Sequence, residues 1–396
     1  MLENINYKLI QELKKSKIPW AIIIGMEMRT SLAIIRSLGR ENIPVLGINL
    51  CQTRSFVTYS KYCQIVVNIH PQKLIDFLLR IGPYFSSQPI IFPESDEICI
   101  IIDNNKIVLN KFYKIMKSKK YKMEELINKA ICHSIFKIHG EFDIPKTIYL
   151  NDNDNLYDKL KYMSYPCIIK PIFNKLIAKE EYIIVKDIYE AIDAIKKIRI
   201  SYNKILIQEY IDTPDNYNYE VLCYRSEREE RSYCCAIRKL RIYPKNTGSS
   251  SYIETTTEID NIFQTIDNFL SKIEYNGLVD FEFKIKEEKL YLIEANFRSS
   301  ANIIISERCK INLPYIAYSD MANFNKKYNY EKYLIGIKWS FENSEILQYL
   351  NGYISIRALF KSLLLSDSHA IFQWDDIKPG KKMVIEIIKK KIKKIF

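Results

Sequence analysis

The stretch Gly277–Arg298, which reads GLVDFEFKIKEEKLYLIEANFR, decides the fold prediction for this chain. Polar and apolar residues alternate in both of its halves, and such alternation is typical of β-strands with one buried face. We therefore expect strands at 278–285 and 290–296, joined into an antiparallel hairpin by a short turn around 286–289.

Carboxylates are predicted to meet across this hairpin. Asp280, Glu282 and Lys284 share one face of the first strand, and Glu294 and Asn296 share one face of the second. A short turn brings Glu282 near Glu294, which is unfavourable unless a cation lies between them. Such oxygen ligands suit Mg²⁺, so the hairpin predicts a metal site of Glu282, Glu294 and Asn296, with Mn²⁺ as a second candidate. The alternative is an amphipathic hairpin whose charges face water.

Composition excludes several classes of protein. The 396 residues suggest two or three domains. No two of the ten glycines are closer than eight positions, which excludes both a GxGxxG dinucleotide fingerprint and a Walker A loop. The four histidines show no zinc-binding spacing. The net charge of +12 is concentrated at the end of the chain, so the mildly basic remainder predicts no nucleic-acid partner.

The same features predict a cytoplasmic location. No apolar run approaches the roughly 20 residues of a membrane span, and we expect no signal peptide. Nine scattered cysteines without a CxxC pair fit a reducing compartment. The last sixteen residues, 381–396, place Val384, Ile388, Ile392 and Ile395 on one helical stripe among seven lysines. Either they form an interfacial helix drawn to the inner face of the membrane, or they are a basic, frayed terminus.

The rest of the chain divides by pattern. Alternating strands and helices in the first hundred residues predict an open parallel α/β sheet. A helix at 124–139 follows, and after it come strands at 166–170, 183–185 and 205–211. The polar stretch 244–251 predicts a mobile loop.

Motifs upstream of the hairpin carry a family resemblance. Asn128-Lys129, PCIIKP with Lys170, ILIQEYI at 205–211 and the hairpin's Glu-x-Asn-x-Arg follow one another in this order. In this the chain resembles the ATP-grasp superfamily, and within it the carboxylate–amine ligases similar to D-aspartate ligase. The family commonly has proline where this chain has Phe297, and its phosphate-covering loop is often glycine-rich, whereas 171–185 contains no glycine.

The resemblance implies roles for individual residues. Lys129 and Lys170 would hold nucleotide phosphates, and Arg298 would stabilise a transferring phosphoryl group or acyl phosphate. Lys239 and Arg241 would share one strand face and meet phosphate or a substrate carboxylate, while the Gly248–Ser251 loop would close over the acceptor. Further nucleotide contacts would come from the strand that meets adenine, through its main chain, and from the strand after it: Gln208, Glu209, Tyr210, Ile211 and Glu220.

The resemblance also implies a fold and an activity. We expect an α/β protein with a Rossmann-like pre-ATP-grasp domain at 1–120 and two α+β ATP-grasp subdomains at 121–204 and 205–320. A helical extension at 321–396 would follow. The implied reaction joins a small carboxylate, such as an amino acid, to an amine with ATP and Mg²⁺, in cell-envelope or surface-polysaccharide synthesis. Family members are often homodimers. The alternatives are a nucleotide-binding scaffold without turnover and a membrane-surface adaptor.

Overall fold

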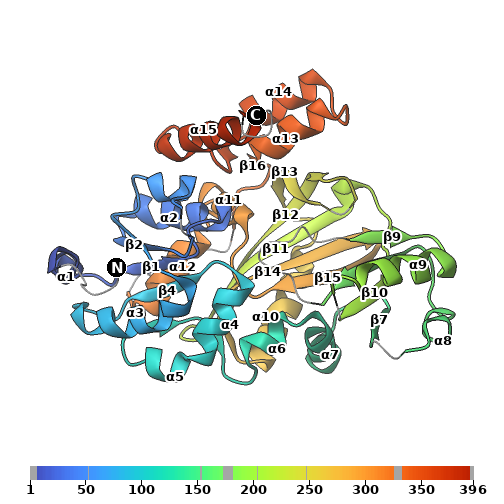
Figure 1. The fold of residues 1–396 in the computed structure, drawn as a ribbon, viewed down its shortest axis with the longest axis horizontal. Coiled ribbons are helices and arrows are strands. Elements are labelled where there is room, and N and C mark those ends of the chain that lie inside the picture. Colours follow the sequence, from blue (N-terminus) through green and yellow to red (C-terminus); the bar gives the residue numbers. More distant parts are fainter. Residues whose placement is uncertain are drawn as a thin grey trace.

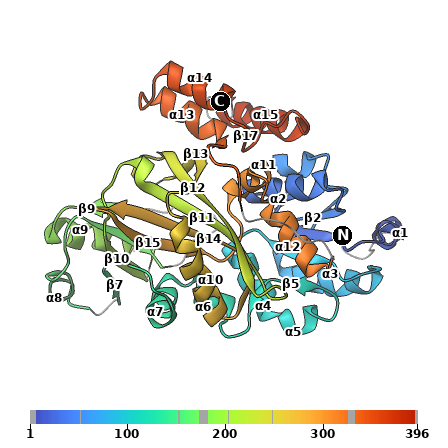
Figure 2. The ribbon, with the colours of Figure 1, turned by 180° about the vertical axis from the view of Figure 1, so that it is seen from behind.

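A computed structural model of the protein describes residues 7–51, 53–151, 154–172, 182–202, 204–246, 248–324 and 332–392, with side chains as far as Glu386. Three β-sheets occupy the body of the molecule, and helices from the end of the chain form a further layer along one side (Figure 1). Figure 2 shows the same arrangement from behind.

The N-terminal sheet is parallel throughout, in the order β3-β2-β1-β4-β5. Its strands are β1 (Ala21–Ile24), β2 (Val45–Asn49), β3 (Ile65–Asn68), β4 (Ile90–Pro93) and β5 (Lys114–Ile115). Because side chains alternate along a strand, Ile23 packs with α2 (Arg29–Arg40), whereas Ile22 packs with α3 (Leu74–Ile81) on the other face. The predicted parallel α/β sheet is confirmed.

The second sheet is antiparallel, in the order β7-β10-β8-β9. Its strands are β7 (Thr147–Leu150), β8 (Cys167–Pro171), β9 (Ile183–Val185) and β10 (Ile205–Glu209). Helix α9 (Ile188–Ile198) covers one face and shares a core with Ile205 and Ile207. The structure differs here from the subdomain boundary expected at 204–205, because β10 pairs with both β7 and β8 and so completes this sheet.

The third sheet runs in the order β15-β14-β11-β12-β13-β16-β17 and is antiparallel except between its last two strands. Its strands are β11 (Asn218–Ser226), β12 (Arg231–Tyr243), β13 (Ser249–Thr256), β14 (Tyr275–Lys286), β15 (Lys289–Asn296), β16 (Lys338–Ser340) and β17 (Ser368–His369), and β6 (Lys117–Ser118) pairs with the start of β14. One face packs on α10 (Phe263–Lys272), and the other shares a continuous core with α2. The N-terminal domain is therefore fixed to this sheet.

The predicted hairpin at 277–298 is confirmed, with Glu282 directly opposite Glu294 and Asp280 opposite Asn296. Its turn is made by Glu287 and Glu288, which both have positive φ, at 51° and 61°. Tight two-residue turns of this type, which join antiparallel strands, require positive φ at both of their central residues.

The helix predicted at 124–139 is interrupted. It consists of α6 (Met123–Ile127) and α7 (Lys129–His139), which meet at Asn128. The Asn128 side chain accepts hydrogen bonds from the backbone N–H groups of Ala130 and Ile131, so it acts as the N-cap of α7. The consequence is that Lys129 begins a helix at a fixed position.

The C-terminal part contributes to the sheet as well as to the outer layer. Besides β16 and β17, the segment expected to be a helical extension contains α13 (Glu342–Leu350), α14 (Ile356–Leu364) and α15 (Lys378–Ile392). Just before it, α11 (Ile304–Arg308) and α12 (Leu313–Met321) pack against α2. The remaining helices are α1 (Tyr7–Lys15), α4 (Asp96–Asn104), α5 (Lys106–Leu109) and α8 (Leu156–Leu160). Within the described ranges, no helix has the length and apolar character needed to cross a bilayer.

Candidate active site

A cleft of about 380 Å³ lies between the second and third sheets, and the start of α2 lines its far end. Of the predicted site residues, Lys129 and Arg241 do not line it. All the others do: Lys170, Gln208, Glu209, Tyr210, Ile211, Glu220, Lys239, Glu282, Glu294, Asn296 and Arg298.

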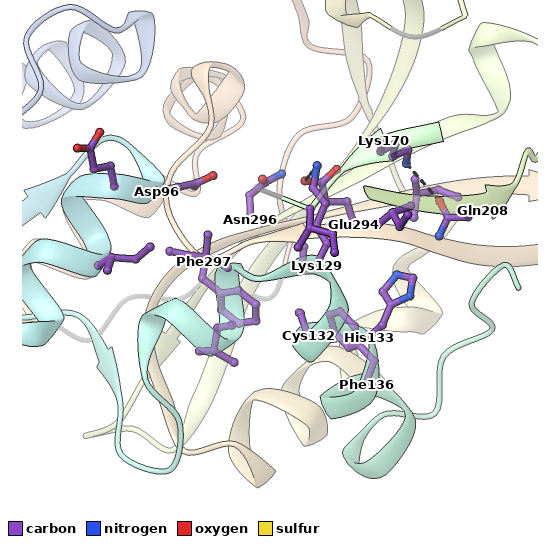
Figure 3. Close-up of a pocket in the computed structure, with 18 of the residues that line it drawn as sticks. Asp96, Lys129, Cys132, His133, Phe136, Lys170, Gln208, Glu294, Asn296 and Phe297 are labelled. Atoms are coloured by element: carbon purple, nitrogen blue, oxygen red, sulfur yellow. Dashed lines mark hydrogen bonds and ion pairs between the residues drawn. The ribbon is translucent and has the colours of Figure 1, made fainter. Parts of the chain in front are cut away.

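Two lysines meet at one side of the cleft. Lys170 on β8 is buried, and its Nζ donates to Gln208 Oε1 at 3.2 Å. Lys129 projects from the start of α7 into an adjoining pocket that Lys170 and Glu294 also line (Figure 3), and its Nζ lies 3.6 Å from Glu294 Oε1. The Tyr182 ring is within 5.7 Å of both ammonium groups. The ammonium groups of Lys129 and Lys170 therefore lie near each other although they come from separate elements, as the binding of a polyphosphate requires.

Burial, together with the nearby positive charges, keeps His133 neutral. His133 lies on α7 and lines the same pocket (Figure 3). Burial, and after it the positive charges of Lys170 and other nearby lysines, lower the pKa of His133 to about 4. The imidazole is thus uncharged at neutral pH, so the lysines and not His133 supply the positive charge that attracts an anion.

The strand end predicted to meet adenine is partly occupied by protein contacts. The N–H groups of Glu209 and Tyr210 donate to the carbonyls of Lys146 and Pro166, and Ile211 O accepts from Lys284 Nζ at 2.9 Å. No hydrogen bond from the Ile211 N–H occurs within the part of the chain that the structure describes. Ile211 lines the cleft, and this donor keeps its hydrogen-bonding capacity unused.

The hairpin supplies an oxygen-rich donor set suited to a divalent cation. Glu282 and Glu294 are cross-strand neighbours, and Asn296 follows Glu294 on the same face of β15. Lys129 approaches Glu294, and Lys239 Nζ approaches Glu282 Oε2 at 2.7 Å, so a lysine offsets the charge of each carboxylate. Two carboxylates and an amide oxygen on one rigid hairpin are hard ligands that Mg²⁺ or Mn²⁺ favours.

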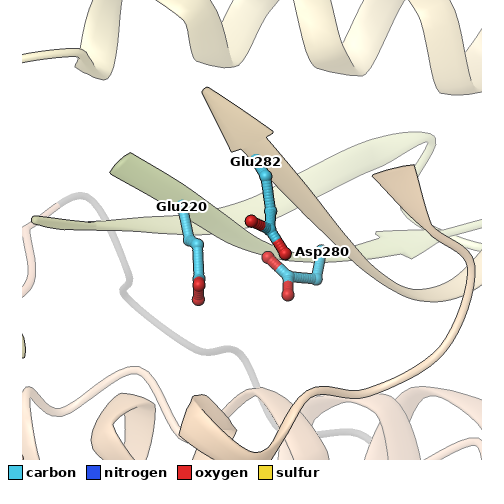
Figure 4. A group of neighbouring side chains, drawn as sticks. All are labelled: Glu220, Asp280 and Glu282. Carbon is cyan, nitrogen blue, oxygen red and sulfur yellow. The ribbon is translucent and has the colours of Figure 1, made fainter. Parts of the chain in front are cut away.

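A second acidic group lies deeper in the cleft. Oxygens of Glu220, Asp280 and Glu282 come within 4.8 Å of one another (Figure 4). Lys239 Nζ is 2.7 Å from both Glu220 Oε1 and Glu282 Oε2. Burial works to lower the pKa of Lys239, but the two carboxylates outweigh it and hold that pKa above its ordinary value. The ammonium group of Lys239 therefore offsets part of the negative charge of this group of acids.

Arg298 bridges two domains. Its Nε donates to Asp96 Oδ1 at 2.6 Å, at the start of α4. Phe297 replaces the proline common in the family, and its ring is buried against Tyr275 with centroids 5.1 Å apart. The Arg298 N–H also donates to Asn296 O at 2.8 Å, which closes a tight turn. The position of Arg298 is thus fixed by packing and hydrogen bonding without proline.

Comparison with known proteins supports a common fold. Residues 201–339 match the model of a family described as ATP-grasp in the biosynthetic pathway with Ter operon. D-aspartate ligase of Enterococcus faecium is 25% identical over 231 residues, which are 52% of each chain. An ADP complex of N5-carboxyaminoimidazole ribonucleotide synthetase superposes with a TM-score of 0.65 at 10% identity, covering 84% of this chain and 86% of that one. For the L-amino acid ligase of Bacillus licheniformis the TM-score is 0.54 at 13% identity, with 77% and 75% covered.

The chain has an ATP-grasp fold. Its sheets agree with the fold that the resemblance in the sequence implied, and about half of the chain is similar in sequence to D-aspartate ligase. It spans about half the length of the curated relative that it matches.

Arg241 does not lie where the sequence predicted, because it does not line the cleft. The pairing of β12 with β13 is irregular between Lys239 and Ile242, and a bulge of this kind redirects side chains. Lys239 therefore points to the cleft, whereas Arg241 forms an ion pair with Glu345 on α13 and lies over the Tyr252 ring at 4.4 Å. Its contacts are with the C-terminal helices.

The predicted loop at Gly248–Ser251 is also different. Ser249, Ser250 and Ser251 begin strand β13, and both Ser250 and Ser251 are buried. Ser250 Oγ donates to Glu220 Oε1 at 2.8 Å, so this segment is part of the wall of the cleft. The phosphate-covering segment expected after Lys170 falls at 173–181, outside the described residues.

Two residues at the far end of the cleft were not predicted. Arg29, the first residue of α2, stacks its guanidinium on the Phe341 ring at 3.8 Å. Burial lowers the pKa of Arg29 to about 10, although the charge of Glu342 opposes this. Arg29 Nη1 and Ser300 Oγ are buried without a hydrogen-bond partner among the described residues. Sequence spacing offered no signal, because these residues lie 271 positions apart and only the domain packing brings both to one cleft.

Proposed function

We propose that this ATP-grasp protein is an ADP-forming ligase that joins a small carboxylate to an amine. The observation that carries the proposal is one continuous cleft. It is lined by Lys170 and Ile211, by Glu282, Glu294 and Asn296, and by Arg298 and Arg29. One cleft would therefore take the nucleotide, the metal and a second substrate.

The residues present would divide the work of phosphoryl transfer. The Ile211 N–H would donate a hydrogen bond to a purine nitrogen, and Lys129 and Lys170 would hold phosphate oxygens as point charges. Glu282, Glu294 and Asn296 would hold Mg²⁺, which when bound offsets the charge of the β- and γ-phosphates. Catalysis of this kind is mainly positioning and neutralisation of charge.

The substrate carboxylate would take the γ-phosphoryl group of ATP and leave ADP. The product is an acyl phosphate, whose carbonyl carbon is attacked by the amine with loss of inorganic phosphate. Arg298, fixed by Asp96, would stabilise the phosphoryl group and the tetrahedral adduct. Arg29 and Ser300 would orient an anionic end of a substrate through donors that the protein leaves unpaired.

A role in cell-envelope or surface-polysaccharide synthesis in the cytoplasm, with a homodimer as the working form, belongs to the same proposal. It rests on the family resemblance of the sequence.

The test measures ADP and phosphate release with Mg-ATP across amino acids of both hands, with hydroxylamine replacing the unknown amine to trap an acyl phosphate. We expect a hydroxamate that depends on the acid and is absent with Glu294→Ala. Nucleotide binding without ADP from any acid would support the scaffold instead, and AMP with pyrophosphate would contradict the mechanism.

A further inference from the structure

Helix α13 attaches to the body of the protein through its polar side. Glu345, which is fully buried, pairs with Arg241, and Gln348 Nε2 donates to Ser251 Oγ at 2.7 Å. Glu342 accepts hydrogen bonds from the backbone N–H groups of Ile371 and Phe372. Residues that normally face water are therefore used to dock this helix.

The opposite side of α13 is apolar and faces outward. Ile346, Tyr349 and Leu350 are exposed, with Leu350 64% accessible. A helix that buries its charged residues and exposes its apolar ones reverses the usual arrangement for a globular protein. A cluster of exposed apolar side chains on one side of a helix indicates a contact surface.

Helix α14, which packs beside α13, continues the same surface. Its residues Ile356, Phe360 and Leu364 follow one another at intervals of four and are all exposed, with Leu364 at 72%. Leu359 and Ser362 form its buried side. The α13–α14 surface, defined as Ile346, Tyr349, Leu350, Tyr353, Ile356, Phe360, Leu364 and Leu365, lies on the outermost layer of the molecule (Figure 1).

Two basic side chains flank the α14 part of this surface, and the exposed acid Asp367 lies just beyond its end. Arg357 and Lys361 are exposed and each follows a residue of the apolar row by one position, so they flank it on the helix. The acidic residues of α13, Glu342 and Glu345, are turned inward and engaged. An apolar row with tyrosines and flanking basic residues is the pattern of a helix that lies in the headgroup region of an anionic bilayer.

We propose that the α13–α14 surface docks this protein on an anionic lipid bilayer. This places the membrane contact on a folded pair of helices rather than on the lysine-rich terminus alone. In α15, Met383 packs against the core and Lys382 Nζ lies over the Tyr59 ring at 4.4 Å, so that helix is partly engaged with the body. The proposal does not depend on the ligase activity.

The test is co-sedimentation of the full chain with phosphatidylcholine vesicles and with mixed phosphatidylcholine–phosphatidylglycerol vesicles. We expect the wild-type protein to bind the mixed vesicles more tightly. The variant Leu364→Glu/Leu365→Glu should lose at least about tenfold in affinity, because two apolar side chains no longer enter the lipid. Arg357→Glu/Lys361→Glu should remove the preference for phosphatidylglycerol.

The matched control is Ile107→Glu/Ile200→Glu, which adds the same charges at two side chains that are 83% and 87% exposed elsewhere in the protein. It should bind vesicles like the wild type, and thermal unfolding checks that every variant folds. Equal loss in the control, or no binding by the wild type, would overturn the proposal. So would loss only with Lys390→Glu/Lys391→Glu, or a wild-type dimer that Leu364→Glu/Leu365→Glu dissociates without an effect on vesicle binding.

Discussion

At the residue scale, the site shows how buried charges are kept in place. Lys239 is shared by Glu220 and Glu282, while Lys129 lies beside Glu294. Each lysine lies on a different element from the acid that it faces, so the local sequence around the acids does not reveal how they are neutralised. The same contacts allow specific substitutions to be argued one at a time.

Replacement of Lys239 by methionine should destabilise the protein. The change leaves Glu220 buried without its cation, and breaking a buried pair on one side typically costs about 3–5 kcal/mol. Chemical denaturation at pH 7 measures the loss. The control Lys239→Met/Glu220→Gln should recover part of it, and a single variant as stable as the wild type would contradict the pairing.

His133 should make stability depend on pH. Its folded pKa is about 4, below the ordinary 6.5, so between these values the unfolded chain takes up a proton that the folded chain does not. Stability contributed by the neutral imidazole is therefore lost as the pH falls from about 6.5 to 4. In His133→Gln, the loss of unfolding free energy across this pH range should be smaller by about 1–2 kcal/mol. If the variant showed the same dependence of unfolding free energy on pH as the wild type, the lowered pKa of His133 would be contradicted.

Arg29 should determine the affinity for a substrate anion. Arg29→Gln is expected to raise KM for the carboxylic substrate about tenfold or more, since a charge-assisted hydrogen bond is lost, while KM for ATP stays unchanged. Steady-state kinetics with the acid found by the hydroxamate assay measures both constants. An equal rise in both would indicate a general disturbance of the cleft.

At the element scale, the strands and helices place these residues through register and docking. A hairpin turn with two positive-φ residues sets Glu282 against Glu294, and a β-bulge in β12 sends Lys239 and Arg241 to different neighbours. The docking of helix α13 depends on this β-bulge, because the buried Glu345 of α13 pairs with Arg241.

The docking of α13 can be tested without reference to catalysis. Arg241→Met should destabilise the C-terminal layer by about 3 kcal/mol, because it leaves Glu345 buried and unpaired. Faster hydrogen exchange in 342–350 would report the change, and Arg241→Met/Glu345→Met should restore protection. If ADP formation also fails in the double variant, Arg241 has the catalytic role first expected from the sequence.

At the scale of the whole molecule, nucleotide binding should couple the two ATP-grasp sheets. A ligand at about one hundred times its Kd stabilises the folded state by about 2.7 kcal/mol. We expect ADP with Mg²⁺ to raise Tm of the wild type and to have no effect on Lys170→Ala, whose phosphate contact is removed. Differential scanning fluorimetry measures both, and an equal rise in the variant would place the nucleotide elsewhere.

Strong local patterns in the sequence determined several structural elements of this protein. The alternation in 277–298 predicted the hairpin and its register, because this signal depends on neighbours in the sequence, and the order of the motifs with Lys129, Lys170 and Glu294 suggested the fold. The break of the helix at Asn128 and the strand at 249–251 were missed. A helix cap interrupted the helical periodicity, and pairing with β12 overrode the polar composition of the serines.

Only the tertiary structure decided where long-range contacts go. It placed β10 in the second sheet, turned Arg241 toward Glu345, and brought Arg29 to the cleft that Ser300 also lines. It also turned the apolar side of α13 outward. Sequence periodicity identifies the two sides of a helix, but which side is buried depends on the surface that it meets. Here that surface offers Arg241 and Ser251, and it selects the polar side of the helix.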